Sequence, residues 1–354
     1  MMTYHPHKIL VTGGAGFIGA NFIQYLLKEY TDINIVNVDL LTYAGSLHYL
    51  ENVAHHPQYH FVQQTICDQK AIEKMLTDHH IDTIVHFAAE SHVDRSIADP
   101  SVFLQTNVLG TYALLEAARN VWLNEKKWNE SQCRFHHIST DEVFGCLKKD
   151  DPAFSESTPY HPNSPYSASK ASSDHFVRAY HTTYGLPVTL SNCSNNYGCY
   201  QHQEKLIPTI IASCLKNKTI PIYGDGSNIR DWLYVVDHCV AIDKIIRQGK
   251  LGESYNIGGN EERTNLDLTR LICQMTAKMT HQDPSSFLKL IQFVADRPGH
   301  DLRYAINTTK IKNELEWKPQ YNLTEGLRET IYWYLQSAFL NGMTHDHTSF
   351  STQV

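Results

Sequence analysis

Short apolar segments alternate with longer amphipathic segments through the first half of the chain. The apolar segments have the length of buried strands, and the amphipathic ones repeat their apolar residues at helical spacing. The predicted strands are Lys8–Thr12, Ile33–Asp39, Tyr59–Val62, Thr83–Phe87 and Arg134–Ser139. The predicted helices between them are Phe17–Glu29, Gln69–Asp78 and Phe103–Val121. This alternation favours an α/β fold whose parallel sheet is covered by helices on both faces.

The same rhythm continues and then loosens in the second half. A helix is predicted at about Tyr166–Tyr184, followed by a strand at Pro187–Cys193. After Tyr197, Pro, Gly and Asn interrupt the chain repeatedly, as they do in loops. Two later runs, Ser254–Ile257 and Leu288–Val294, look like strands of a smaller unit.

We therefore expect a large domain and a smaller, discontinuous one. The larger domain is expected to span residues 1–195 together with about 228–256, and the smaller one about 197–227 and 257–340. The residues from 342 to 354 are polar and are expected to form a disordered tail.

The charge balance excludes several classes of partner. Lys and Arg number 30 against 37 Asp and Glu, so the 354-residue chain carries a net charge of −7. This balance offers no basic surface for a nucleic-acid backbone, and no run approaches the ~20 apolar residues that span a bilayer. The polar start lacks the apolar stretch of a signal peptide. We expect a cytoplasmic protein that binds neither nucleic acid nor membrane.

Cysteine and histidine show no ligand spacing. The eight cysteines are scattered without a C-x-x-C pair, which favours reduced thiols over a disulfide framework. None of the 21 histidines lies in an H-E-x-x-H or Cys/His pattern. They are interpreted as surface and structural residues, and no metal site is predicted.

A glycine-rich turn follows the first predicted strand. Gly13, Gly16 and Gly19 permit a tight turn, close approach of a pyrophosphate to the backbone and close helix–sheet packing. The helix that begins here offers free N–H groups and a positive dipole end to phosphate. Asp39, at the end of the second strand, can hold a ribose diol and would repel a 2′-phosphate. The sequence thus predicts a dinucleotide site that prefers NAD to NADP.

A tyrosine and a lysine share one face of a predicted helix. Tyr166 and Lys170 are four residues apart, so their side chains point to the same side. A nearby ammonium, aided by the positive nicotinamide, favours the phenolate form of tyrosine, which otherwise has a pKa of ~10. Ser139 and Thr140, at the end of the preceding strand, place a hydroxyl where it can bridge the tyrosine and the reacting oxygen. Together these residues predict alcohol oxidation by NAD, although the spacing also occurs by chance on helix surfaces.

Two adjacent carboxyl groups follow that strand. Asp141 and Glu142 can have pKa values that are pushed apart, which leaves one protonated as an acid and the other free as a base. Removing water from an alcohol needs both functions. A solvated acidic turn at the strand end is an equally good interpretation of the pair taken alone.

The glycine spacing G-x-x-G-x-x-G, with Tyr166-x-x-x-Lys170, resembles the extended short-chain dehydrogenase/reductase family. That resemblance implies a Rossmann-like doubly wound parallel sheet with a smaller mixed α/β C-terminal substrate domain. Further segments are similar to one of its families, the dTDP-glucose 4,6-dehydratases. These segments are Ala88–Ser96, Ser139–Gly145, Asn192–Gly198, Arg230–Val235 and Asp296–Asp301.

The resemblance implies a catalytic role for each polar residue. Tyr166 would take the proton of the sugar's 4-hydroxyl while carbon 4 gives a hydride to NAD, and Thr140 would hydrogen-bond that hydroxyl. Glu142 would remove the proton on carbon 5 as Asp141 protonates the departing 6-hydroxyl. The hydride would then return to carbon 6, so NAD stays bound through the cycle. Lys170 completes the implied catalytic set.

The resemblance also implies two sets of binding residues. The residues implied to contact NAD are Gly13, Gly16, Phe17, Ile18, Gly19, Asp39, Leu40, Leu41, Thr42, Thr65, Ile66, Phe87, Ala88, Ala89, Ser91, Thr106, Tyr166, Lys170 and Asn196. Those implied to hold the nucleotide sugar are Ser91, Thr140, Asn195, Lys205, Leu206, Pro221, Ile222, Tyr223, Arg230, Asn265, Arg297 and His300. Arg230 and Arg297 suit a diphosphate, because a guanidinium binds phosphate oxygens bidentately.

Three positions depart from that family's usual pattern. Thr65 stands where an Asp is usual, which implies a weaker adenine contact. Phe144 replaces a Tyr and Cys199 replaces a Pro. None belongs to the acid–base set, so altered affinity is expected rather than lost chemistry.

Other functions stay open from the sequence. One alternative is a dehydratase, decarboxylase or 4-epimerase acting on a UDP- or GDP-sugar, although the Asp141–Glu142 pair argues against an epimerase. Another is a non-catalytic NAD-sensing or scaffold protein on the same fold, for which the catalytic residues would be expected to be missing. The family resemblance further implies a homodimer formed through the helices Phe103–Val121 and Tyr166–Tyr184.

Overall fold

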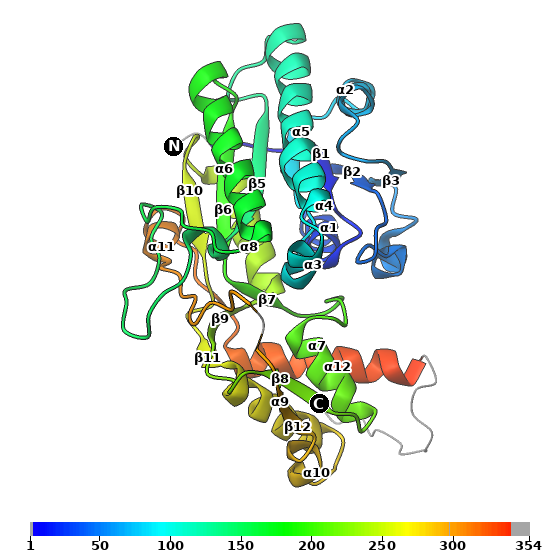
Figure 1. The fold of residues 1–354 in the computed structure, drawn as a ribbon. Coiled ribbons are helices and arrows are strands. Elements are labelled where there is room, and N and C mark those ends of the chain that lie inside the picture. The colour runs from blue at the N-terminus through cyan, green and yellow to red at the C-terminus, as the bar shows by residue number, and fades with distance from the viewer. Residues whose placement is uncertain (1–2, 297, 341–354) are drawn as a thin grey trace.

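The computed structural model describes residues 3–296 and 298–340. It contains a large parallel sheet with helices on both faces, and a smaller unit of short strands and helices at one end of that sheet (Figure 1). The seven strands of the large sheet, in the spatial order β10-β6-β5-β4-β1-β2-β3, all pair in parallel. Their bounds are β1 Lys8–Thr12, β2 Asn34–Asp39, β3 Tyr59–Gln63, β4 Thr83–His86, β5 Arg134–Thr140, β6 Val188–Cys193 and β10 Ser254–Ile257.

Both faces of the sheet are apolar, because successive strand residues point to opposite sides. In β1, Ile9 and Val11 pack into a core on one face, and Leu10 packs into a core on the other. The first core lies under α1 Phe17–Glu29 and α8 Val235–Gln248, and the second under α2 Gln69–Asp78, α5 Thr111–Ala118 and α6 Pro165–Tyr184. The doubly wound Rossmann-like arrangement predicted from the sequence is confirmed.

The helix predicted at Phe103–Val121 is longer and less regular than expected. Its segments are α4 Ser101–Phe103, η2 Leu104–Gly110, α5 and η3 Arg119–Glu125, of which η2 and η3 are π-helical. Within η2, the Asn107 carbonyl accepts hydrogen bonds from the hydroxyls of Thr111 and Ser173, both at 2.6 Å. Hydroxyls that compete for a backbone carbonyl loosen an α-helical ladder. The apolar spacing of the sequence does not reveal this irregularity.

The smaller unit has its own core. One sheet has the order β11-β9-β7 and another pairs β12 with β8. The strands are β7 Asn195–Tyr197, β8 Ile220–Tyr223, β9 Ile229–Tyr234, β11 Glu262–Thr264 and β12 Ile291–Val294. The helices are α7 Leu206–Leu215, α9 Asn265–Met279, α10 Pro284–Leu288 and α12 Leu323–Leu340. Ile210, Leu268 and Leu327 are fully buried between these elements.

Two sequence expectations require correction. The run Ser254–Ile257 looked like a strand of the smaller unit, although the expected division kept residues up to about 256 in the larger domain. It is β10, the edge strand of the large sheet beside β6, and its apolar residues complete the core under α8. The predicted strand Leu288–Val294 begins only at Ile291. Asp283 caps the preceding helix α10 through the Ser285 amide, and that helix takes up Leu288. The tail expected at 342–354 lies outside the described residues.

The remaining short helices connect these layers. They are η1 Leu47–Val53, α3 Val93–Ala98, η4 Asp141–Phe144 and α11 Thr309–Leu315. In the part of the chain that the structure describes, no helix is long and apolar enough to cross a bilayer. The chain reverses its winding direction between β1 and β4, which are neighbours in the sheet. Ligands of open α/β sheets bind at such a switch point, beyond the carboxyl ends of the strands.

Candidate active site

A cavity of about 340 Å³ lies at this switch point. Its walls come from the carboxyl ends of β1, β2, β4, β5 and β6, and from the loop between β7 and α7 of the smaller unit. All the residues expected to contact NAD line it except Leu41, and so do the five expected catalytic residues. The structure therefore brings the predicted cofactor and catalytic residues together in one space.

The turn after β1 has the close packing that its glycines allow. Gly13 has φ +70°, and a Cβ there would lie 2.6 Å from the backbone nitrogen of Ala88. A Cβ on Gly19 would lie 2.4 Å from the carbonyl oxygen of Gly13. The start of α1 thus lies directly against the turn, and Gly16, Phe17 and Ile18 line the cavity. The free N–H groups of a helix start suit a pyrophosphate.

The carboxylate of Asp39 binds backbone amides on the other side of the glycine turn. Its Oδ2 accepts a hydrogen bond from the Ala15 amide at 3.0 Å, and its Oδ1 accepts one from the Leu41 amide at 2.8 Å. Burial raises the pKa of Asp39, and the two amides oppose that shift. A carboxylate has about four lone-pair sites, so two amides leave capacity for a ribose diol. Leu41, which does not line the cavity, acts here through its backbone.

Tyr166 and Lys170 are buried on the first turns of α6. The helix begins there because Ser164 and Ser167 form a capping box and Pro165 occupies the first position. Lys170 Nζ donates to the carbonyl of Ile138 in β5 at 2.7 Å. Tyr166 hydrogen-bonds the side chain of Thr140.

The pKa of Tyr166 lies well above its ordinary value, opposite to the direction expected from Lys170 and NAD. Burial is the main cause, and the negative charge of Glu142 adds to it, while the hydrogen bond from Thr140 opposes it. The expected direction took account of the positive charges near Tyr166 but not of its burial, which has the larger effect on its pKa. Phenolate in this site therefore depends on positive charge supplied nearby.

Asp141 and Glu142 form η4, directly after β5. Thr140 caps this turn, accepting from the Glu142 amide at 3.3 Å, and its hydroxyl also contacts Asp141 Oδ1 at 3.3 Å. Asp141 is 2% exposed. Burial raises its pKa well above the usual carboxyl range, and the Glu142 charge raises it further. The geometry thus leaves a protonated carboxyl beside a second, half-buried one, as an acid–base pair requires.

The expected sugar-nucleotide residues fall into two groups. Ser91, Thr140, Asn195 and Lys205 line the cavity. Leu206, Pro221, Ile222, Tyr223, Arg230, Asn265 and His300 do not line it and belong to the smaller unit. Arg297 lies outside the described residues.

Several residues of the second group lie near one another. The Tyr223 and His300 rings are 6.2 Å apart edge to face. A Cβ on Gly226 would lie 2.9 Å from both Ile222 and Leu266, which places the end of β8 against the start of α9. Arg230 donates to the backbone carbonyls of Ile229 and Asp301, at 2.7 and 2.9 Å. This second group therefore lies together in the smaller unit, apart from the cavity lining, with Ile222 in that unit's core and Arg230 also buried.

The departures from the expected pattern have local explanations. The Thr65 hydroxyl accepts from the Cys67 amide at 3.2 Å at the cavity wall. Phe144 packs between the rings of Phe154 and Tyr160, each 5.2 Å away, so its missing hydroxyl would have no place in that apolar cluster. The Cys199 carbonyl accepts from Asn21 in α1 at 3.0 Å.

Sequence reasoning missed part of the cavity wall. The additional lining residues are Val38, Ala44, Gly45, Gln64, Cys67, Ile138, Cys193, Ser194, Gln201, His202 and Glu204. Glu204 and His202 come one and three residues before the expected Lys205, and this proximity is the signal that could have found them. Ser139 was expected to face the reacting oxygen, but its hydroxyl donates to Asp174 at 2.7 Å. Within the described residues, no three His, Cys, Asp or Glu side chains are grouped as metal ligands.

Known proteins of similar sequence identify the family. The family model described as GDP-mannose 4,6 dehydratase matches residues 10–330. The dTDP-glucose 4,6-dehydratase of Haemophilus influenzae is 50% identical over 331 residues, which cover 93% of this chain and 98% of the relative. That of Shigella flexneri is 52% identical over 338 residues, 93% of this chain and 92% of the relative. The chain belongs to the dTDP-glucose 4,6-dehydratase family.

Solved structures agree with this assignment. The dTDP-glucose 4,6-dehydratase of Bacillus anthracis, in complex with NAD, has a TM-score of 0.83 at 44% identity and covers 94% of this chain and 98% of its own. The UDP-glucose 4-epimerase of Thermotoga maritima has a TM-score of 0.81 at only 27% identity, covering 93% and 99%. The fold is thus shared with epimerases, whereas the higher sequence identity is with the dehydratases.

Proposed function

We propose that this chain is an NAD-dependent hydro-lyase that converts dTDP-glucose to dTDP-4-keto-6-deoxy-glucose. The observation that carries the proposal is the Asp141–Glu142 pair in the same cavity as Tyr166 and Lys170. An epimerase needs only the hydride exchange, whereas loss of water also needs an acid and a base. Family membership supports the dTDP sugar over a UDP- or GDP-sugar, since the relatives near 50% identity are named for it.

The cavity fits NAD as its resident cofactor. The glycine turn leaves no room for side chains between β1 and Ala88, and the Asp39 carboxylate keeps acceptor capacity at the cavity wall. When bound, NAD supplies the acceptor for a hydride from carbon 4 of the sugar and the donor that returns it to carbon 6. Glu90, His202 and Glu204 at the cavity wall are further candidates to surround it.

The chain's own residues then move the protons. Tyr166, hydrogen-bonded to Thr140, accepts the proton of the 4-hydroxyl, and the Lys170 charge favours the phenolate that this requires. The new ketone acidifies the proton on carbon 5, which Glu142 removes. Asp141, protonated in its buried site, gives its proton to the 6-hydroxyl, which leaves as water. The proton held by Glu142 returns to carbon 5. The cycle closes when Tyr166 releases its proton to solvent and Asp141 takes one up from solvent.

For the substrate, we propose that Ser91, Asn195 and Lys205 contact the sugar end and that the second group of the smaller unit contacts the nucleotide. The division into a domain of residues 1–195 with about 228–256 and a substrate domain of about 197–227 and 257–340 belongs to this proposal, with the first domain extended to Ile257. Arg230 then supplies positive charge near the diphosphate, although its N–H groups already have partners in the chain.

We also propose a cytoplasmic homodimer that acts without nucleic acid or membrane. Large apolar side chains project from the α4–α5 and α6 faces, where Leu104 is 56%, Leu109 50% and Phe176 41% exposed. Such a patch is unusual on a monomer. Sedimentation of the wild type and of Leu104→Asp should give a dimer and a smaller species, respectively.

A direct assay tests the proposed activity. Purified protein is incubated separately with dTDP-glucose, UDP-glucose and GDP-mannose. Mass spectrometry then measures loss of water, and NMR spectroscopy detects epimerisation, which leaves the mass unchanged. Only the dTDP sugar should give a product lighter by one water. Epimerisation of any of the three without loss of water would overturn the proposal.

A further inference from the structure

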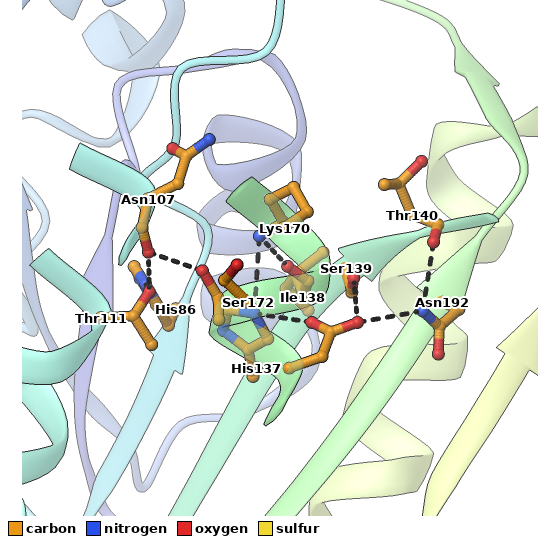
Figure 2. A network of polar contacts seen from close by, with 12 residues as sticks. His86, Asn107, Thr111, His137, Ile138, Ser139, Thr140, Lys170, Ser172 and Asn192 are labelled. Atoms are coloured by element: carbon orange, nitrogen blue, oxygen red, sulfur yellow. Dashed lines mark hydrogen bonds and ion pairs between the residues drawn. The ribbon is translucent and has the colours of Figure 1, made fainter. Parts of the chain in front are cut away.

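A buried polar chain runs below the cavity from Lys170 to Asp174. His137 Nε2 lies 3.5 Å from Lys170 Nζ and 3.2 Å from Asp174 Oδ1. The side chains of His137 and Asp174 have 0% exposure. Figure 2 shows Lys170 beside His137, and Ser139 and Asn192 lie to the right of these two residues in that view. His137 comes from β5, whereas Lys170 and Asp174 are one turn apart on α6.

The hydrogen-bond donors around Asp174 favour its charged form. Its Oδ2 accepts from the hydroxyl of Ser139 at 2.7 Å and from that of Tyr160 at 2.9 Å, with the Asn192 amide at 3.5 Å. A carboxylate can accept all of these, whereas a protonated carboxyl would lose acceptor capacity. Asp174 is therefore a buried anion held by several donors, although burial raises its pKa.

The other titratable groups around this chain supply no negative charge. Burial lowers the pKa of His86 in β4 and of His137 well below the usual range, so both are neutral. Burial raises the pKa of Cys193 in β6 to about 12, which keeps it a thiol. Arg178, also on α6, is positive, and Tyr160 donates its hydrogen. Apart from Tyr166, whose phenolate Lys170 is proposed to favour, Asp174 is the anion among the described groups that face Lys170.

Lys170 needs such a partner because it is itself buried. It is 4% exposed, and burial lowers its pKa while the Asp174 charge opposes that shift. A neutral amine could not favour phenolate at Tyr166. Removing the Asp174 charge would therefore lower the pKa of Lys170 and favour loss of its proton.

We propose that Asp174 is a positioning residue of the active site, whose charge acts past the neutral ring of His137 to keep Lys170 an ammonium. The inference rests on the catalytic role proposed above for Lys170. A bland alternative is that Asp174 serves only to hold Ser139 and Tyr160 in place. The two differ in one respect: only the first couples the effect of Asp174 to the charge of Lys170.

A stability cycle separates these alternatives without using activity. Asp174→Asn keeps the shape of the side chain and removes the charge, and Lys170→Met removes the buried cation. Removing one member of a buried pair is far more damaging than removing both. Asp174→Asn should thus lower Tm markedly in the wild type and much less in Lys170→Met. Equal losses in the two backgrounds would overturn the proposal, whether or not the enzyme proves to be a dehydratase.

Failure to fold is also informative. If Asp174→Asn gives insoluble protein but the double variant with Lys170→Met folds, the coupling is supported. If the double variant fails while Lys170→Met alone folds, Asp174 is needed for packing and the proposal falls. Asp243→Asn is the matched control, since Asp243 is also a buried helical carboxylate, bonded to Arg247 at 2.8 Å in α8.

The pH profile of the reaction gives the second readout. Activity requires a protonated Lys170, so it is lost as pH rises through the lysine pKa. In Asp174→Asn that pKa falls, and the basic limb of kcat/KM should move to lower pH by about one unit or more. Asp243→Asn should leave the limb in place. A uniform loss at every pH in Asp174→Asn would point to a structural role and contradict the proposal.

Discussion

Glu204 Oε2 lies 3.6 Å from His92 Nε2, and this pair joins the smaller unit to the large domain at the rim of the cavity. Arg95 reaches the same carboxylate at 3.9 Å and stacks on the Tyr43 ring at 3.6 Å. Tyr43 follows β2, His92 and Arg95 lie at α3, and Glu204 precedes α7. The cluster therefore links the two units beside the cavity wall, which Glu204 lines.

Glu204→Gln is expected to loosen the retention of NAD. The amide keeps the size of the side chain but loses the ionic attraction for Arg95 that links the two units. Burial lowers the pKa of His92, so its ring is neutral near pH 7 and adds no ion pair. A partly exposed pair of this kind is worth roughly 1 kcal/mol at most, so NAD should dissociate up to about fivefold faster. The NAD that copurifies with the protein, measured after gel filtration, checks this.

A matched control for this variant is Glu253→Gln. Glu253 pairs with Lys310 at 2.7 Å, away from the cavity. It should retain as much NAD as the wild type. Unchanged retention in both variants would show that the rim cluster does not hold the cofactor.

The parts of the site that are local in sequence could be predicted, and the parts assembled from distant segments could not. Gly13, Asp39 and the pair Tyr166–Lys170 are recognisable because each lies within a few residues of a strand end or on one helical turn. The contact between His137 and Asp174 joins β5 to α6, and nothing in either segment alone indicates it.

The same distinction applies to the fold. The alternation of apolar and amphipathic segments predicted the large sheet and several element bounds, such as Phe17–Glu29. It left Ser254–Ile257 ambiguous between the two units, because an edge strand joins its sheet by pairing with β6 and not by its position in the chain. It also missed the burial of Tyr166, which reverses the direction of its pKa shift.

Glu142→Gln should separate oxidation from dehydration. The variant keeps Tyr166, Thr140 and Lys170, so hydride transfer from carbon 4 is retained, but no base remains for the proton on carbon 5. Turnover should fall by roughly 10²–10⁴-fold, the range for loss of a general base. Absorbance of the reduced cofactor should rise after mixing with dTDP-glucose, while mass spectrometry finds no loss of water. Full turnover of the variant would remove Glu142 from the mechanism.

Asp39→Asn should weaken NAD binding and its preference over NADP. The substitution removes the charge that holds the Ala15 and Leu41 amides and that would repel a 2′-phosphate. Hydrogen bonds to charged groups contribute about 1.5–3 kcal/mol, so the Kd for NAD should rise about tenfold or more, with a smaller change for NADP. Calorimetric titration of cofactor-free protein measures both. Asp68→Asn, at the start of α2, should change neither value.

Asp141→Asn should make the protein more stable near neutral pH while it loses dehydration. Burial raises the pKa of Asp141 above its unfolded value of ~3.9. Such a group contributes stability that is fully present below the unfolded pKa and is lost as pH rises through the folded pKa. Asparagine has no charge to bury, so the variant escapes this loss. Thermal unfolding should show a Tm gain for the variant that grows from pH ~4 upward. A gain that is constant with pH would mean that folding does not change the pKa of Asp141.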